Sequence, residues 1–302
     1  MKRSNNVILL IVLLVLLGGF VLARFLRAPS LESNLEEHLL TIDTSKVSVI
    51  HIRPAAENGE IKLVRAGNAW KVERGETKSN VEVSHIKTAL RSISKIQPER
   101  LLTRKKEKWA DYHVDSTGTN VKVYTGNEDP TEFWIGKTSS GGNSVRIEGN
   151  DNVYEVKGAL DGNFNKRFAG WRDKTFLKVE PEKISRITFE YPSDSSFVVE
   201  RSNGKWNINN VQADSAKVAT YLNRFRSRTL SEFADNFTPP EKPAYIVTLN
   251  NDSATSLTLR GWKTDDNKWV VTSNVQDQVY FSSNDKTLMN QLFAGKSAFI
   301  SK

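Results

Sequence analysis

The chain contains no cysteine and only four histidines among its 302 residues. Without cysteine it cannot form disulfides, use a thiol nucleophile, carry lipoprotein acylation, or bind zinc or an iron–sulfur cluster through thiolates. The histidines show no H-x-H or H-E-x-x-H spacing, so we interpret all of them as structural or surface residues rather than metal ligands. They are His38, His51, His85 and His113.

Motifs for nucleotide binding and acyl-transfer catalysis are also missing. The sequence has no G-x-G-x-x-G, no G-x-x-x-x-G-K-[ST] and no G-x-S-x-G, so the chain is not itself predicted to be an ATPase. Adjacent acids at 36–37 and 265–266 are neighbours within a turn and do not predict a carboxylate pair across a cleft. We therefore predict a protein that is not an enzyme and has no cofactor, metal or catalytic residues. An unrecognised hydrolase ranks third, after the two binding hypotheses given at the end of this section.

One long apolar run is present, at residues 7–23, followed by Arg24 and Arg27. Seventeen residues of helix span about 26 Å, close to the thickness of a bilayer core of about 30 Å. We predict an uncleaved anchor at 1–27 and a stalk at 28–38; a cleaved signal peptide is the alternative. The expected location is the bacterial inner membrane, single-pass, with the bulk of the chain extracytoplasmic (periplasmic).

The net charge of +8 and a pI near 9.4 would favour anionic surfaces, but we interpret them as a generally basic surface without a specific partner. Basic residues gather at 97–109, a segment that has no counterpart in the second half of the chain. Because runs of charge are usually solvated and Glu107 interrupts this one, we interpret it as a solvated charged surface; the alternative is a contact for an anionic membrane or an acidic partner. The residues are Arg100, Arg104, Lys105, Lys106 and Lys108. Nucleic acid is not an expected partner of an exported domain.

The two halves of the chain resemble each other. The segment at 39–50 aligns with 176–187 without a gap, and a turn followed by tryptophan recurs at 64–75 and 200–211. Conserved spacing of this kind predicts one structural unit present twice. We place the first repeat at 39–165 and the second at 172–302.

Each repeat contains one helical pattern. Apolar residues spaced i, i+3, i+4 and i+7 form one stripe of a helix in both halves. Ser84 and Asp214 are the expected N-caps, and Pro98 is expected to end the first helix. The stripes are Ile86, Ala89, Leu90 and Ile93 in the first repeat, and Val218, Tyr221, Leu222 and Phe225 in the second.

Short alternating runs follow each helix and are broken by turn residues, which predicts antiparallel strands joined by hairpins. The runs are NVKVY, EFWIG, SVRIE and NVYEV in the first repeat, and AYIVTL, SLTLR, KWVVT and QVYFS in the second. The predicted fold class is α+β: tandem duplicated units, each a mostly antiparallel sheet with one packed helix, after an N-terminal transmembrane helix.

The order of these segments resembles a bacterial family known as domain of unknown function 4340. The resemblance is carried by LLTIDTSKVSVIHI, the W-K-V at Trp70, WADYHVDSTGTNVKVY, FWIGKTSSGGNSVRI, VYEV and WRDKTFLKVEPEKISRITF. It implies a single N-terminal membrane segment and, from some members, an auxiliary role beside gliding-motility-type ABC transporters. The family supplies no catalytic residues, and at His113-Val114 this chain departs from its commoner Y-G-L pattern.

Two functional hypotheses follow. The first is a membrane-anchored extracytoplasmic interaction or scaffold protein, an accessory subunit of an ABC transporter. The alternative is an exported protein that binds an envelope glycan or lipid by stacking on tryptophan. Trp134 and Trp262 are the candidates for stacking, because they occupy non-equivalent positions in the two repeats, whereas Trp70 and Trp206 are expected to be core residues.

Overall fold

The computed structural model describes residues 13, 16, 17, 38–126, 129–138, 140–209, 211–252, 254–264, 268–276 and 278–301. The predicted anchor at 1–27 and all but the last residue of the stalk at 28–38 therefore lie outside the described residues, apart from three helical, exposed leucines at 13, 16 and 17. Among the residues described, no helix is long and apolar enough to cross a membrane.

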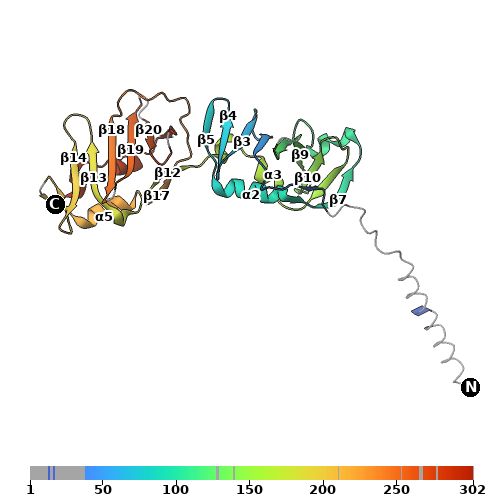
Figure 1. Ribbon diagram of the computed structural model, residues 1–302, viewed down its shortest axis with the longest axis horizontal. Coiled ribbons are helices and arrows are strands. Elements are labelled where there is room, and N and C mark those ends of the chain that lie inside the picture. The colour runs from blue at the N-terminus through green and yellow to red at the C-terminus, as the bar shows by residue number, and fades with distance from the viewer. Residues whose placement is uncertain are drawn as a thin grey trace, which may run out of the picture.

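The first half of the chain forms a nine-stranded antiparallel sheet (Figure 1). Its strand order is β5-β4-β3-β2-β8-β9-β10-β11-β7. The strands are β5 (Thr77–Asn80), β4 (Ala69–Arg74), β3 (Ile61–Ala66), β2 (Val49–Arg53), β8 (Thr119–Tyr124), β9 (Thr131–Lys137), β10 (Asn143–Ile147), β11 (Val153–Val156) and β7 (Pro98–Thr103). The alternating runs predicted at 120–124, 132–136, 144–148 and 152–156 coincide with β8 to β11, so these predictions are confirmed.

Helix α2 (Val83–Ser94) packs on one face of this sheet through Ile86, Ala89 and Ile93, which belong to the same apolar cluster as the inward residues of the strands. Two short helices, α3 (Leu160–Phe164) and α4 (Phe168–Trp171), complete that cluster. The opposite face of the sheet is left to the polar residues that alternate with the core residues. A two-stranded sheet joins β1 (Leu40–Thr41) to β6 (Lys95–Ile96).

The second half forms an eight-stranded antiparallel sheet in the order β16-β15-β14-β13-β18-β19-β20-β21. The strands are β16 (Val211–Gln212), β15 (Lys205–Ile208), β14 (Phe197–Ser202), β13 (Ile184–Glu190), β18 (Tyr245–Asn251), β19 (Thr255–Lys263), β20 (Trp269–Ser273) and β21 (Phe281–Ser283). Helix α5 (Ser215–Asn223) packs on it, and β12 (Thr175–Lys178) pairs with β17 (Ser227–Thr229). The end of the chain adds α6 (Lys286–Leu292) and the 3-10 helix η4 (Lys296–Phe299). The mostly antiparallel α+β class is thus confirmed for both halves.

The repeated tryptophans are core residues, as predicted. Trp70 and Trp206 are 9% and 8% exposed and belong to the two separate apolar clusters. Each also lies opposite an arginine on the neighbouring strand, with the Arg65 guanidinium carbon 5.1 Å from one ring centroid and that of Arg201 5.7 Å from the other. The turn followed by tryptophan, which occurs at 64–75 and 200–211, therefore forms the same cross-strand cation–aromatic pair in both halves.

Two local predictions for the first helix are wrong. Its N-cap is Glu82, whose carboxylate accepts from the Ser84 backbone N–H at 3.3 Å, so Ser84 lies inside the first turn. The longer glutamate side chain can fold back over the helix start, a role that sequence preferences assign to shorter residues. The helix also ends at Ser94, before Pro98, because the chain turns into β6 to pair with β1.

The basic segment at 97–109 forms β7 and the 3-10 helix η1 (Lys106–Lys108). Strand β7 pairs with β11 and becomes the outermost strand of the first sheet, at the end of the strand order. In the described part of the second half no strand occupies this place, but residues 232–234 lie along β21, where Phe233 forms an isolated antiparallel bridge with Phe281. The longer segment of the first half therefore forms a six-residue edge strand and a 3-10 helix where the second half has an isolated bridge.

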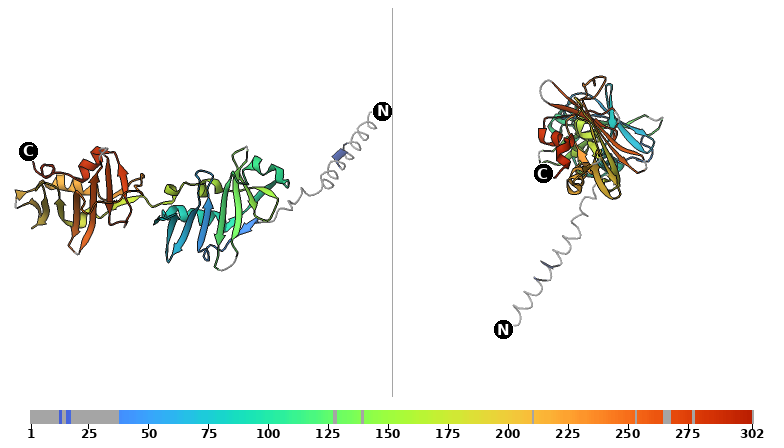
Figure 2. Two further views of the ribbon diagram at one scale, coloured as in Figure 1. Left: turned by 90° about the horizontal axis from the view of Figure 1, so that it is seen from above. Right: turned by 90° about the vertical axis from the view of Figure 1, so that its left-hand side faces the viewer.

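The two halves lie end to end (Figure 2) and meet at Arg172. This side chain is 2% exposed and donates to the Ser79 hydroxyl of the first sheet and to the Asp235 carboxylate of the second half, each at 2.8 Å. Its guanidinium carbon also lies 3.5 Å from the centroid of the Phe233 ring. Burial lowers the pKa of Arg172, whereas the hydrogen bond and charge of Asp235 oppose that shift.

Candidate functional site

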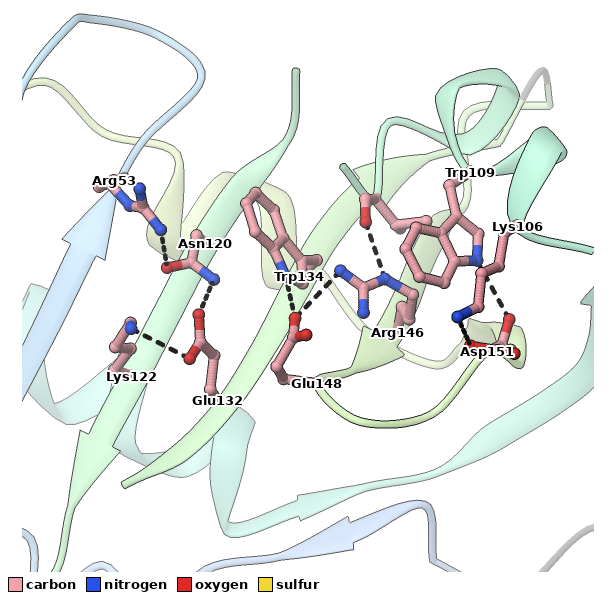
Figure 3. Close-up of polar contacts among 11 residues, drawn as sticks. Arg53, Lys106, Trp109, Asn120, Lys122, Glu132, Trp134, Arg146, Glu148 and Asp151 are labelled. Atoms are coloured by element: carbon pink, nitrogen blue, oxygen red, sulfur yellow. Dashed lines mark hydrogen bonds and ion pairs between the residues drawn. The ribbon is translucent and has the colours of Figure 1, made fainter. Parts of the chain in front are cut away.

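The candidate site is the polar face of the nine-stranded sheet, on the side opposite α2. Strand register places four side chains in one row across four strands: Arg53 on β2, Asn120 on β8, Trp134 on β9 and Arg146 on β10. Directly paired residues point to the same face, so these four lie side by side (Figure 3). We call this set, with Trp109 beside it, the arginine–tryptophan row.

Arg146 is the centre of the row and is only 3% exposed. Its guanidinium carbon lies 3.9 Å from the Trp109 ring centroid and 5.6 Å from that of Trp134, so the cation lies between two indoles. One nitrogen donates to the Val114 carbonyl at 3.0 Å, and another lies 3.2 Å from the Glu148 carboxylate. A buried charge is costly unless it is paired and hydrogen-bonded, and here both conditions are met.

Glu148 joins Arg146 to Trp134. Its carboxylate accepts from the Trp134 indole N–H at 2.8 Å, in addition to its ion pair with Arg146. The Trp134 hydrogen bond, followed by the charge of Arg146, holds the pKa of Glu148 below its ordinary value against the opposing effect of burial. The carboxylate is therefore ionised at neutral pH and fixes the orientation of both side chains.

The row continues toward β2 through amide and carboxylate groups. The Arg53 guanidinium donates to the Asn120 side-chain oxygen at 3.0 Å, and the Asn120 amide donates to Glu132 at 2.9 Å. Lys122 completes the chain with an ion pair of 3.0 Å to Glu132 (Figure 3). Asn120 is 2% exposed, so this network is held as rigidly as Arg146 is.

A pocket of about 350 Å³ opens beside the row. Trp134, which is half-buried, and Arg53, which is exposed, both line it, so a ligand would meet an aromatic face and a cation. The remaining lining comes from the loop after β2 and the turn before β8, including Glu57 and Gly118. Glu57 is already engaged, because it pairs with Arg74 at 3.0 Å.

The row is suited to recognition. It offers flat aromatic surface, fixed cations and satisfied hydrogen bonds, which together bind by stacking and charge. Among the side chains that the structure describes, no group of three or more histidine, aspartate or glutamate residues could hold a metal ion. His51, on the same face, lies 3.2 Å from Glu60, and burial is the main cause that lowers its pKa.

The structure brings together two of the sequence-predicted sites. Trp134 belongs to the row, and Lys106 from the basic segment lies at the end of the row. The Lys106 ammonium is 3.2 Å from the Asp151 carboxylate, and the backbone carbonyl of Asp151 accepts from the Trp109 indole N–H at 3.1 Å (Figure 3). Arg100 is bound separately to Glu155, at 2.5 Å. The three remaining basic residues have exposed side chains with no ion pair within the described part of the chain. They are Arg104, Lys105 and Lys108.

Trp262 lies elsewhere, on β19 of the second sheet. It is 6% exposed and is covered by Phe237, 5.4 Å away between ring centroids, and by Tyr280, 6.0 Å away. It lines a pocket of about 490 Å³ with a proline-rich segment at 239–243, but the surrounding rings leave little of its indole to a ligand. The two candidate tryptophans therefore occupy different environments, and only Trp134 presents a half-buried ring.

Sequence reasoning missed Arg53, Trp109 and Arg146. Arg53 and Arg146 alternate with core residues in their strands, a pattern that marks them as outward-facing but gives no sign of burial. Burial of Arg146 comes from Trp109, which η1 and the following 3-10 helix at 110–112 bring over the sheet. The tryptophan inside the basic segment was the one available signal.

Comparison with known proteins gives one match. A family model described as domain of unknown function (DUF4340) matches residues 78–250, more than half of the chain. Neither curated proteins nor solved structures give a match.

Proposed function

The chain belongs to the family of domain of unknown function 4340, and we propose that it is a membrane-anchored, extracytoplasmic interaction protein that is not an enzyme. The binding surface in this proposal is the arginine–tryptophan row of the first sheet. The anchor is the apolar run at 7–23, and the partner is a membrane-protein complex such as an ABC transporter, which the family resemblance implies.

The observation that carries the proposal is the burial of Arg146 between Trp109 and Trp134. Tryptophan and arginine are the residues most enriched among those that dominate binding energy at protein interfaces. Rigid aromatic and cationic groups lose little conformational entropy on binding, so a row fixed by hydrogen bonds favours recognition of a partner. Simple sheet stability would be served as well by apolar or small polar side chains in these positions.

We also propose that the two halves are copies of one unit. Their sheets share one strand order around equivalent helices, with β5 to β2 and β8 to β11 in the first matching β16 to β13 and β18 to β21 in the second. Arg172 joins the units through Ser79 and Asp235, which gives the chain the extended form of a spacer or scaffold. Such a form would hold the second unit away from the membrane.

Affinity purification of the full chain from membranes tests the proposal. The double variant Arg53→Ala, Trp134→Ala removes the exposed cation and the aromatic surface, and we expect it to lose at least tenfold of a membrane partner that the unchanged chain recovers. Arg228→Ala, at an exposed arginine of β17, is the matched control. Recovery of no membrane partner by the unchanged chain, or equal recovery by the double variant, would contradict the proposal.

The pocket beside Trp134 favours a second candidate, an envelope glycan or lipid bound by stacking. A sugar ring on the indole with an acidic group at Arg53 fits a pocket of about 350 Å³ lined by both residues. Titration of soluble peptidoglycan fragments should then change tryptophan fluorescence in the unchanged chain, and this change should disappear in Trp134→Phe. A change of equal size in that variant would exclude Trp134 as the stacking residue.

A further inference from the structure

The junction with the second unit and the basic strand β7 lie at opposite edges of the first sheet. At the β5 edge, the Asp173 backbone N–H donates to the Asn80 carbonyl at 2.8 Å and Arg172 forms a bridge with Val81. Strand β7 is the last strand at the other edge. Figure 1 shows the result, with β7 at one end of the first unit and the second unit beyond the other end.

The chain enters the first unit at the β7 end. Leu40 pairs with Ile96, and the Leu39 backbone N–H donates to the Ile96 carbonyl at 2.8 Å. Pro98, the first residue of β7, follows two positions after Ile96. The first continuously described residue is His38, and the stalk between it and the proposed anchor is short enough to span at most about 36 Å. An anchor at 1–27 therefore holds the start of β7 within about 36 Å of the bilayer. The segment 104–108 follows the other end of this six-residue strand, about 20 Å farther along the edge.

Unpaired basic side chains collect at this end. The segment at 97–109 has five basic and two acidic residues, and only Arg100 and Lys106 of the basic ones form ion pairs in the part of the chain that is described. Edge strands often carry charges that prevent pairing with other sheets. That purpose does not account for the three unpaired residues, because they lie beyond the end of β7. These residues are Arg104, Lys105 and Lys108.

We propose that the segment 104–108 binds the anionic headgroups of the membrane in which the chain is anchored. The inference rests on the proposed anchor. Flexible, exposed cations without fixed partners suit the diffuse negative potential of a lipid surface, whereas a protein partner would require shaped contacts such as those of the arginine–tryptophan row. Tethering also raises the local concentration of headgroups around the β7 end, so a few weak contacts are enough to orient the unit.

Energy transfer in reconstituted vesicles tests the contact. Because the chain has no cysteine, Glu107→Cys can be labelled alone in the full-length protein, with Ser202→Cys as the label on the distant unit. The vesicles contain phosphatidylcholine with or without one quarter phosphatidylglycerol, plus an acceptor lipid. We expect transfer from position 107 to rise with phosphatidylglycerol and to fall in 0.5 M salt, whereas position 202 stays unchanged.

Charge variants complete the test. Replacing the three unpaired cations with glutamine should weaken the headgroup interaction about a hundred-fold, judged from about fivefold per residue, and should abolish the composition dependence at position 107. The matched control replaces three exposed lysines of the second unit and should leave the composition dependence at position 107 intact. The test set is Arg104→Gln, Lys105→Gln and Lys108→Gln, and the control set is Lys205→Gln, Lys242→Gln and Lys286→Gln.

The outcomes separate the contact from the anchor. Transfer from position 107 that is the same in both lipid mixtures would overturn the headgroup contact. Failure of the chain to float with pure phosphatidylcholine vesicles would instead overturn the proposed anchor. A chain that floats only with phosphatidylglycerol, reversibly in salt, would support the contact and reject the anchor.

Discussion

The two halves of the molecule share a strand order and differ in what covers the polar faces of their sheets. In the first half, β9 presents Trp134 to a pocket and keeps Arg146 in a fixed cationic row. In the second, β19 presents Trp262, which Phe237 and Tyr280 cover. The two outer faces therefore differ at this tryptophan: Trp134 lines an open pocket beside the exposed Arg53, whereas Trp262 is closed in by aromatic residues of its own half.

The difference extends to the outer strands. Beyond β21 the described residues of the second half add only the isolated bridge of Phe233 to Phe281, whereas the first sheet continues to the six-residue strand β7 and the basic residues that follow it. Features common to both halves, such as Trp70 and Trp206, are core features. The features on which binding is proposed, the arginine–tryptophan row and the basic residues after β7, belong to the first half.

The largest expected effect concerns the shared core. Trp70→Ala and Trp206→Ala should each lower the free energy of unfolding by about 3–5 kcal/mol, because each removes a large buried ring from an apolar cluster. Chemical denaturation followed by circular dichroism measures both. Similar losses would support equivalence of the two units, whereas a loss below about 1 kcal/mol in either variant would contradict its core assignment.

The second-largest loss of stability is expected at the junction between the two halves. Arg172→Met removes the stacking on Phe233 and two hydrogen bonds while keeping an apolar stem, and we expect a loss of about 2–3 kcal/mol. Scanning calorimetry should show the transitions of the two units separating. Arg201→Met, at an exposed arginine over Trp206, is the control and should change stability by less than about 0.5 kcal/mol. Equal losses of stability in Arg172→Met and Arg201→Met would show that Arg172 does not stabilise the junction more than an exposed arginine does.

Removing the N-caps of α2 and α5 should have smaller effects on stability, and the two effects should differ. Asp214 accepts from two backbone N–H groups of α5, at 3.0 and 3.1 Å, whereas Glu82 accepts from one N–H of α2 at 3.3 Å. Asp214→Ala should therefore lower the melting temperature more than Glu82→Ala does. Thermal melts of the two variants measure the difference, and the reverse order would show that the cap geometry does not set the cost.

The smallest effect is the acid dependence of the arginine–tryptophan row. The folded pKa of Glu148 lies below its ordinary value of 4.5, so its stabilising contribution is complete above that pH and is lost as pH falls through the lowered folded pKa. Its side chain is half exposed, and solvent screening keeps the contribution below about 1 kcal/mol. Trp134 fluorescence should report this acid transition.

Glu148→Gln is the control for that titration. It keeps the shape of the side chain but cannot ionise, so the acid transition of Trp134 fluorescence should vanish. The second unit has no described equivalent of this carboxylate–indole bond, because the Trp262 indole nitrogen has no hydrogen-bond partner. An acid transition that persists in Glu148→Gln would assign it to another group.

Local patterns predicted much of the fold. Alternating residues located β8 to β11 and β18 to β20, and both helical stripes became buried faces, with Leu90 only partly buried. Strand β7 was not predicted, since its proline and charges are typical of a loop and its pairing with β11 joins distant segments. Of the candidate site, Trp134 and Lys106 were identified. Arg146 was not, because the covering Trp109 lies in a distant segment of the chain and does not appear in local periodicity.

The sequence by itself determined which residues alternate and which stripe of each helix is apolar, because these properties depend on periods of two and 3.6 residues along the chain. Only the tertiary structure decided that Trp109 covers Arg146, that Trp262 is covered by Phe237, and that β7 lies opposite the junction. These features arise from register and from contacts between distant segments. Strand pairing, rather than any local motif, places the charged and aromatic residues on one surface.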